Sequence, residues 1–242
     1  MKYLLEKIIS ILIDIIDRYY HMKRLSTYLK KINIDSNSTI FDVGTHKGEY
    51  IEFFLRINNS CKIYSFEPQN NLFKNLNNKY HSKNNINLHN LGLGERKEKQ
   101  VMNINIKSST STLSKLNYES NYLKFKSKIL GTNINKMFYK KENVQIQTID
   151  NIFVEKNLDK IDILKIDTLG FEYKVLKGAE KSLQKINLII IEFRTHDAYL
   201  DYNPIMIHDY LEKNNFLLSK SFKFPFMNWE DRIYINKYYK NT

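Results

Sequence analysis

Residues 39–48 read TIFDVGTHKG and carry the clearest structural signal in the chain. The first five residues are β-branched or aromatic around one aspartate, which is typical of a buried strand. A turn with two glycines follows, and the residues from Gly48 to Ile57 have the composition of a helix. Such a turn lets the backbone approach a ligand closely, and a helix that begins there presents unpaired N–H groups. The stretch therefore predicts a strand–turn–helix unit with a ligand at its turn.

The same unit recurs along the chain. Further strands are predicted at 61–66, 86–91, 161–166 and 188–191, and helices at 70–80, 172–183 and 204–213. This alternation predicts an α/β fold with a parallel sheet that is covered by helices on both faces. Two strands at 216–222 and 232–235 close the chain. Polar alternation at 99–106 and 143–149 predicts two more strands, which we expect to be antiparallel or peripheral.

The composition is that of one folded, basic protein. The chain has 242 residues, and its apolar share of 42% is too high for a disordered tail. The single cysteine, Cys61, excludes a disulfide framework and a cysteine-based metal site, and it suits a reducing cytoplasm. The net charge of +12 favours an anionic partner, such as nucleic acid, anionic lipid or a phosphorylated small molecule.

Residues 1–36 are predicted to form a separate N-terminal element, ahead of a main domain at 37–242 with an insertion at about 95–150. Apolar residues recur in this element at steps of three and four, which predicts a long amphipathic helix. Acidic residues such as Glu6 and Asp14 interrupt the apolar run, so it is neither a signal peptide nor a membrane span. We expect the helix to pack on its own domain or on a second copy in a homodimer. The alternative is peripheral contact with a membrane through its basic end.

Acidic side chains stand at the carboxyl ends of the predicted parallel strands. Asp42 precedes the Gly44 turn, and Glu67 ends the next strand. An acidic residue at the second position can bind both hydroxyls of a ribose; the alternative is an ordinary strand-end carboxylate before Pro68. The first turn lacks the G-x-G-x-x-G pattern of a pyrophosphate site, so we expect a nucleoside without a pyrophosphate. S-adenosylmethionine, an adenosine with a cationic sulfonium and an amino-acid tail, meets these requirements.

Catalytic candidates follow the later strands. Asp167 ends one of them, where it can face a sulfonium, act as a base or cap the next helix. Glu192 and His196 follow the next strand. A histidine there can take a proton from a hydroxyl, because its usual pKa is about 6.5; the alternative is a merely solvated side chain. Carboxylate oxygens are the ligands that Mg²⁺ prefers, so the candidate magnesium site consists of Asp167, Glu192 and Asp197.

Seven short segments occur in the order found in a known family. They read FDVGTHKGEY, SFEP, NLGLGE, SSTSTL, QTIDNI, ILKIDTLGFEYKVLKGA and IIIEF, between residues 39 and 193. The series resembles the FkbM-type S-adenosylmethionine-dependent methyltransferases. The resemblance implies a Rossmann-like class I methyltransferase sheet over the main domain, mostly parallel with a final antiparallel hairpin. It also implies O-methylation, often of sugar hydroxyls or other small natural products.

The resemblance implies roles for individual residues. Asp42 and Gly44 would line the methionine end of the cofactor, Glu67 would hold the ribose, and Asn90 and Leu91 would lie near the adenine. The predicted cofactor-binding residues are Asp42, Gly44, Thr45, His46, Tyr50, Glu67, Pro68, Asn90 and Leu91.

Together these features predict an S-adenosylmethionine-dependent O-methyltransferase in the cytoplasm. The basic charge favours an anionic acceptor, so we expect a sugar hydroxyl of a nucleotide-activated sugar or of a surface glycan of the capsule or lipopolysaccharide type. The catalytic candidates are Asp167 or His196 as the base, with Glu192 as its orienter or alternative. Two other functions stay open. One is an RNA methyltransferase, although no nucleic-acid catalytic motif occurs, and the other is a non-catalytic interaction subunit of the same fold.

Overall fold

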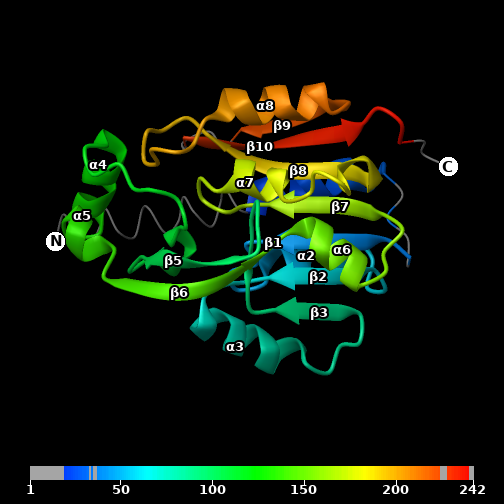
Figure 1. The fold of residues 1–242 in the computed structure, drawn as a ribbon, viewed down its shortest axis with the longest axis horizontal. Helices are drawn as coiled ribbons and strands as arrows, with labels where there is room; N and C mark the ends of the chain where they lie inside the picture. Colours follow the sequence, from blue (N-terminus) through cyan, green and yellow to red (C-terminus); the bar gives the residue numbers. More distant parts are fainter. Residues whose placement is uncertain (1–18, 33, 35–36, 224–227, 240–242) are drawn as a thin grey trace.

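A seven-stranded sheet forms the centre of the protein (Figure 1). The computed structural model describes residues 19–32, 34, 37–223 and 228–239. In spatial order the strands are β3 (Ile86–His89), β2 (Lys62–Phe66), β1 (Thr39–Val43), β7 (Ile161–Ile166), β8 (Ile186–Arg194), β10 (Trp229–Asn236) and β9 (Phe216–Lys223). The first five strands in this order are parallel, and β10 pairs antiparallel with both of its neighbours. This confirms the predicted α/β fold with a final antiparallel hairpin.

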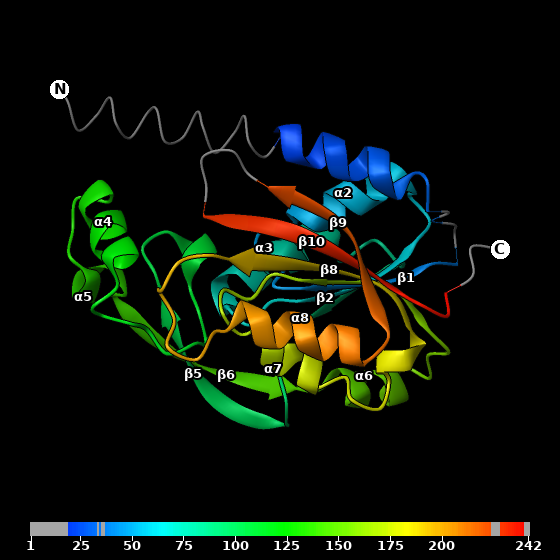
Figure 2. The same cartoon turned by 90° about the horizontal axis from the view of Figure 1, so that it is seen from above.

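Helices cover both faces of the sheet (Figure 2). They are α2 (Glu49–Ile57), α3 (Asn70–Tyr80), α6 (Ile149–Glu155), α7 (Glu172–Lys177), α8 (Pro204–Lys213) and a helix at residues 19–29. Helices α6, α7 and α8 share one buried apolar cluster with Phe41 and Leu164. The helix at 19–29, α2 and α3 share another with Ile40 and Ile163. Successive residues of a strand point to opposite faces, so β1 and β7 supply residues to both clusters.

The insertion forms a second, smaller sheet beside the carboxyl ends of the central strands (Figure 1). The sheet begins with β4 (Gly92–Leu93), just before the insertion, and the insertion itself contains β5 (Glu98–Ile104), the short helix η1 (Ser108–Thr110), α4 (Asn121–Ile129), α5 (Ile134–Met137) and β6 (Lys140–Gln147). Strands β5 and β6 are antiparallel to each other and outside the central sheet, as expected. Helices α4 and α5 pack on their own small apolar cluster around Leu123 and Met137.

Several predicted boundaries are wrong, and two of them show a clear structural difference. The helix predicted to reach residue 183 ends at Lys177, and the short helix η2 (Leu183–Lys185) follows separately. The Gly178 carbonyl accepts the Asp150 N–H at 2.9 Å, and the Asp150 carboxylate accepts the Ser182 N–H at 2.8 Å. In a continued helix the Ser182 N–H would donate to the Gly178 carbonyl. Here each of these two groups is bound to Asp150 instead, so the helix does not continue. Strand β8 is longer than predicted, so Glu192 lies within the strand and not after it.

The N-terminal helix is present, but most of its predicted length lies outside the described residues, which begin at 19. Residues 19–29 are helical. Leu25 and Leu29 of this helix are fully buried against the sheet. No helix in the described part of the chain is both long and apolar enough to cross a membrane.

Candidate active site

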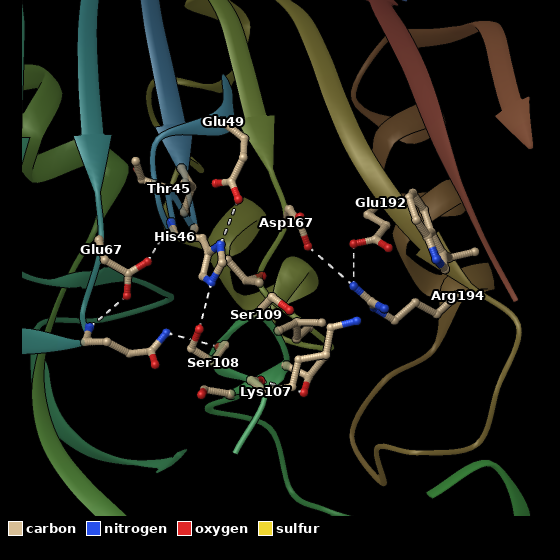
Figure 3. A pocket seen from close by; sticks show the side chains of 18 of the residues that line it. Thr45, His46, Glu49, Glu67, Lys107, Ser108, Ser109, Asp167, Glu192 and Arg194 are labelled. Atoms are coloured by element: carbon tan, nitrogen blue, oxygen red, sulfur yellow. Dashed lines mark hydrogen bonds and ion pairs between the residues drawn. The ribbon is translucent and has the colours of Figure 1, made fainter. Parts of the chain in front are cut away.

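A pocket of about 490 Å³ opens at the carboxyl ends of β1, β2, β7 and β8 (Figure 3). Gly44, Glu67, Asp167 and Glu192, one from each strand end, line it. Small-molecule sites in proteins have volumes of roughly 300–1,000 Å³. In open α/β sheets they lie at this edge. The four strand ends are called the sheet half of the pocket below.

Gly44 brings β1 and β7 into close contact at the edge of the pocket. Its φ is +82°, in the left-handed region. A Cβ at this position would lie 2.0 Å from the carbonyl oxygen of Asp167. The backbone N–H of Gly44 donates to the Phe66 carbonyl at 3.1 Å. Because no side chain fits here, the turn offers bare backbone to the pocket.

The Glu67 carboxylate lies almost fully buried where β2 meets the pocket. Its Oε2 accepts the backbone N–H of His46 and its Oε1 accepts that of Gln69, both at 2.8 Å. Burial raises the pKa of Glu67 to about 7, against the effect of these two hydrogen bonds. A carboxylate has about four acceptor positions, so Glu67 retains acceptor capacity for hydroxyl groups.

His46 connects the β1 turn to the insertion (Figure 3). Its ring Nδ1 lies 3.0 Å from Glu49 Oε1, and its Nε2 lies 3.0 Å from Ser108 Oγ. The side-chain amide of Gln69 also donates to the Ser108 carbonyl, at 3.4 Å. These contacts hold residues 108–110 against the loops that follow β1 and β2. The role as a bridge was not predicted for His46.

A buried lysine balances the acidic residues beneath the pocket. Lys165 of β7 is 3% exposed, and its Nζ lies 3.2 Å from Asp42 Oδ1 and 3.9 Å from Asp167 Oδ2. Burial raises the pKa of Asp42, and the charge of Lys165 opposes that rise. Asp42, which was predicted to contact the cofactor, lies beneath the pocket and is not among its lining residues. Sequence reasoning missed Lys165, although a lysine inside an apolar strand signals a buried partner.

Asp167 and Glu192 form a charged cluster with Arg194 (Figure 3). Arg194 Nη2 lies 3.4 Å from Asp167 Oδ1 and contacts the Glu192 carboxylate directly. Burial raises the pKa of Glu192 well above its usual range, and the neighbouring Asp167 adds to the rise. Burial alone would raise the pKa of Asp167 too, but the charge of Lys165 and a hydrogen bond from Glu192 lower it overall. Of the two carboxyl groups, Asp167 therefore has the lower pKa, and its side chain is 38% exposed.

Three further segments complete the pocket, and together they are called its outer half. The insertion contributes Lys107, Ser109, Tyr122, Phe125 and Lys126, the β9–β10 hairpin contributes Asn228, Trp229 and Asp231, and the N-terminal helix contributes His21 and Met22. The outer half combines aromatic rings with cationic side chains. The sheet half combines carboxylates with bare backbone, so the two halves suit different groups of a ligand.

The predicted cofactor residues do not all reach the pocket. Those that line it are Gly44, Thr45, His46, Tyr50, Glu67 and Pro68. Asn90 and Leu91 do not: the Asn90 amide donates to the Glu67 carbonyl at 3.0 Å, and Leu91 packs on the apolar core. Gly92 and Leu93 line the pocket instead. The residues after β3 that border the pocket are thus two positions further along the chain than the predicted ones.

His196 is also outside the pocket lining. Its ring stacks on that of Tyr122, with the centroids 3.9 Å apart, and burial lowers its pKa to about 3. Such a weak base, away from the pocket, does not support the predicted role. Asp197 Oδ1 accepts the Ser120 hydroxyl at 2.6 Å. Among the described residues no group of three or more His, Cys, Asp or Glu side chains can hold a metal ion, so the predicted magnesium ligands are not brought together.

A protein family matches most of the chain. It is the methyltransferase FkbM domain, which covers residues 42–218. No curated protein matches the sequence. Among solved structures, methyltransferase FkbM from Methylobacillus flagellatus KT is similar, with a TM-score of 0.54 and 16% identity. The match covers 84% of this chain and 44% of that one, so the chain spans less than half the length of this relative.

Two further solved structures match with lower TM-scores. TrmK from M. capricolum, solved with S-adenosylhomocysteine, has a TM-score of 0.47 and 16% identity over 88% of this chain and 67% of that one. An rRNA methylase from Streptococcus thermophilus has a TM-score of 0.49 and 11% identity over 88% of this chain and 94% of that one. At these identities, similarity to any of the three structures concerns the fold alone.

Proposed function

Because the chain belongs to the FkbM methyltransferase family, we propose that it transfers a methyl group from S-adenosylmethionine to a hydroxyl oxygen of an anionic sugar. The expected acceptor is a nucleotide-activated sugar or a surface glycan of the capsule or lipopolysaccharide type. Glu67 is the observation that carries the proposal. Its carboxylate lines the pocket at the end of the strand beside β1, where sheets of this kind bind the hydroxyls of a nucleoside ribose.

The sheet half of the pocket fits S-adenosylmethionine. The volume of about 490 Å³ admits a ligand of this size. Glu67 can accept hydrogen bonds from the ribose hydroxyls, the Gly44 turn offers backbone to the amino-acid tail, and the negative charge of Asp167 favours a cation. When bound, S-adenosylmethionine supplies a methyl group on a positively charged sulfur, which leaves as a neutral thioether.

Asp167 has the position and charge to accept the proton of the acceptor hydroxyl. As the new oxygen–carbon bond forms and the sulfur–carbon bond breaks, this proton becomes strongly acidic, so a carboxylate with a low pKa can accept it. Glu192 is less suited to this role, because it is almost fully buried and its carboxylate contacts Arg194 directly. With Arg194 it keeps Asp167 ionised and fixes its orientation.

The outer half supports an anionic acceptor. Lys107 and Lys126 line it, as do the rings of Tyr122, Phe125 and Trp229. Cationic side chains attract phosphate or carboxylate groups, and aromatic faces pack against sugar rings and bases. The net charge of +12 also attracts anionic molecules, over a longer range than these two lysines do.

Binding of S-adenosylhomocysteine, the stable product of the proposed reaction, is expected to weaken as the pH falls below about 7. The hydroxyls donate to the ionised Glu67 carboxylate, so binding favours the ionised form. Below the pKa of about 7 the carboxyl must first lose its proton, which raises Kd by up to about tenfold per pH unit. Isothermal titration calorimetry between about pH 5.5 and 8 measures this slope.

Glu67→Gln is expected to raise Kd roughly 10- to 100-fold, because hydrogen bonds to a charged acceptor are lost, and to abolish the pH slope. Glu180→Gln, on the protein surface, is the control and should bind as the wild type does. A pH-independent wild-type affinity, or unchanged binding by Glu67→Gln, would remove Glu67 from the site.

The activity itself is tested by incubating the protein with S-adenosylmethionine and a panel of nucleotide sugars, with mass spectrometry to detect the gain of one methyl group. A single-stranded RNA in the same panel tests the alternative acceptor, because basic charge and exposed aromatic rings can also bind such strands. Methylated RNA with unmodified sugars would replace the sugar acceptor. No binding of S-adenosylhomocysteine would reject the methyltransferase proposal.

A further inference from the structure

The helix of residues 19–29 forms a wall of the outer half of the pocket. His21 and Met22 line the pocket, and His21 is only 5% exposed. On the same helix, Tyr28 Oη lies 2.5 Å from Ser219 Oγ of β9. Figure 2 shows the helix lying along β9 and β10. The helix is thus docked on the hairpin, and its first described turn borders the site.

His21 lies against Asp231 of β10. Its Nε2 lies 2.8 Å from Asp231 Oδ2, and the two side chains are 6% and 8% exposed. The same carboxylate oxygen accepts the Tyr50 hydroxyl at 2.9 Å. Lys165 Nζ in turn lies 4.4 Å from the centre of the Tyr50 ring. A continuous line of contacts therefore connects His21 to the charged groups around Asp167.

His21 and Trp229 form an aromatic corner of the outer half. Their ring centroids are 6.4 Å apart and the rings meet at 67°. Both residues line the same pocket as Tyr122 of α4 and Asp167 of the sheet half. An acceptor that occupies the outer half therefore contacts side chains of the N-terminal helix as well as those of the main domain.

We propose that His21 is an acceptor-binding residue: it borders the outer half beside Trp229, and the small exposed edge of its ring contacts the sugar of an anionic nucleotide sugar while the reacting hydroxyl lies at Asp167. This inference rests on the proposed methyl transfer and assigns the N-terminal helix a part in acceptor recognition. A ring locked by a buried carboxylate loses little freedom on binding, so its contact with a sugar costs less entropy than that of a mobile side chain.

Trp229 provides a direct test, because it is the only tryptophan of the chain and lies beside His21. The full chain, saturated with S-adenosylhomocysteine, is titrated with UDP-glucose, UDP-glucuronic acid, GDP-mannose and dTDP-rhamnose while Trp229 fluorescence is recorded. We expect a saturable change with at least one of the four. His21→Ala is expected to raise its Kd about tenfold, the size of effect that follows loss of an aromatic packing surface.

Two further variants separate recognition from folding. His21→Asn keeps a donor for Asp231 but loses the ring, and it is expected to show the same loss even if His21→Ala folds poorly. Tyr28→Phe removes a helix-docking contact outside the pocket and should leave the Kd unchanged. In turnover assays the His21 variants should raise KM for the acceptor without lowering kcat.

The inference is overturned if wild-type Trp229 responds to none of the four probes, if His21→Asn binds them as the wild type does, or if Tyr28→Phe shows an equal loss. Calorimetry with S-adenosylhomocysteine is run on every variant. Wild-type affinity for S-adenosylhomocysteine in the His21 variants supports a role confined to the acceptor. No binding by the wild type rejects the proposed function itself.

Discussion

Asp167→Asn is expected to lower kcat by roughly 10²- to 10⁴-fold, the range associated with loss of a general base. The amide has nearly the shape of the carboxylate but cannot accept the hydroxyl proton or hold negative charge. Asp167 lines the pocket and lies 3.4 Å from Arg194 Nη2 and 3.9 Å from Lys165 Nζ. Single-turnover methyl transfer, followed by mass spectrometry, measures the rate of the chemical step.

Calorimetry of S-adenosylhomocysteine should show that Asp167→Asn still binds the product within about threefold, a difference of less than 1 kcal/mol. Asp209→Asn, which makes the same chemical change at an exposed position of α8, is the matched control and should be fully active. Methyl transfer by Asp167→Asn at the wild-type rate would show that another group takes the proton.

Gly44→Ala is expected to abolish measurable binding of S-adenosylhomocysteine and to lower the free energy of unfolding by roughly 3 kcal/mol. The new Cβ would lie 2.0 Å from the Asp167 carbonyl oxygen, at a backbone φ of +82°. Either the turn or the end of β7 must therefore move, and both line the pocket. For a chain of this length the change lowers Tm by roughly 10 °C, which differential scanning calorimetry can follow.

Gly131→Ala is the matched control, because Gly131 also has a positive φ, of 66°, but follows α4 in the insertion. It should be destabilised by backbone strain alone and should bind S-adenosylhomocysteine normally. Equal losses of binding in the two variants would mean that the effect comes from general destabilisation and not from the contact between β1 and β7.

The frame of the fold could be predicted because its signals are local. The strand at 39–43, the glycine turn after it and the helix that follows appear within a few residues of each other, and the parallel order follows from their repetition. Boundaries that depend on distant partners were missed. The helix from Glu172 stops early because the Asp150 side chain, from another helix, takes over the Ser182 N–H.

The site also contains residues with local sequence signals and residues whose positions depend on distant contacts. Glu67 and Gly44 line the pocket, and their positions at strand ends are visible in the sequence. Gly92 lines the pocket and Asn90 does not, because the path of the chain after β3 decides which residues reach it, and sequence periodicity does not describe that path. His21 and Asp231 come from opposite ends of the chain, so no local pattern could bring them together. Lys165 was also missed, but in this case a local signal existed. A lysine among apolar strand residues indicates a buried ion pair.

The two halves of the pocket are encoded by different parts of the polypeptide. Strand ends of the parallel sheet supply the sheet half, whereas the N-terminal helix, the insertion and the hairpin supply the outer half. Under the proposed function, substitutions in those peripheral segments are expected to change which acceptor is modified more than how the methyl donor is held. Exchange of these segments between related proteins is a direct way to test this division of labour.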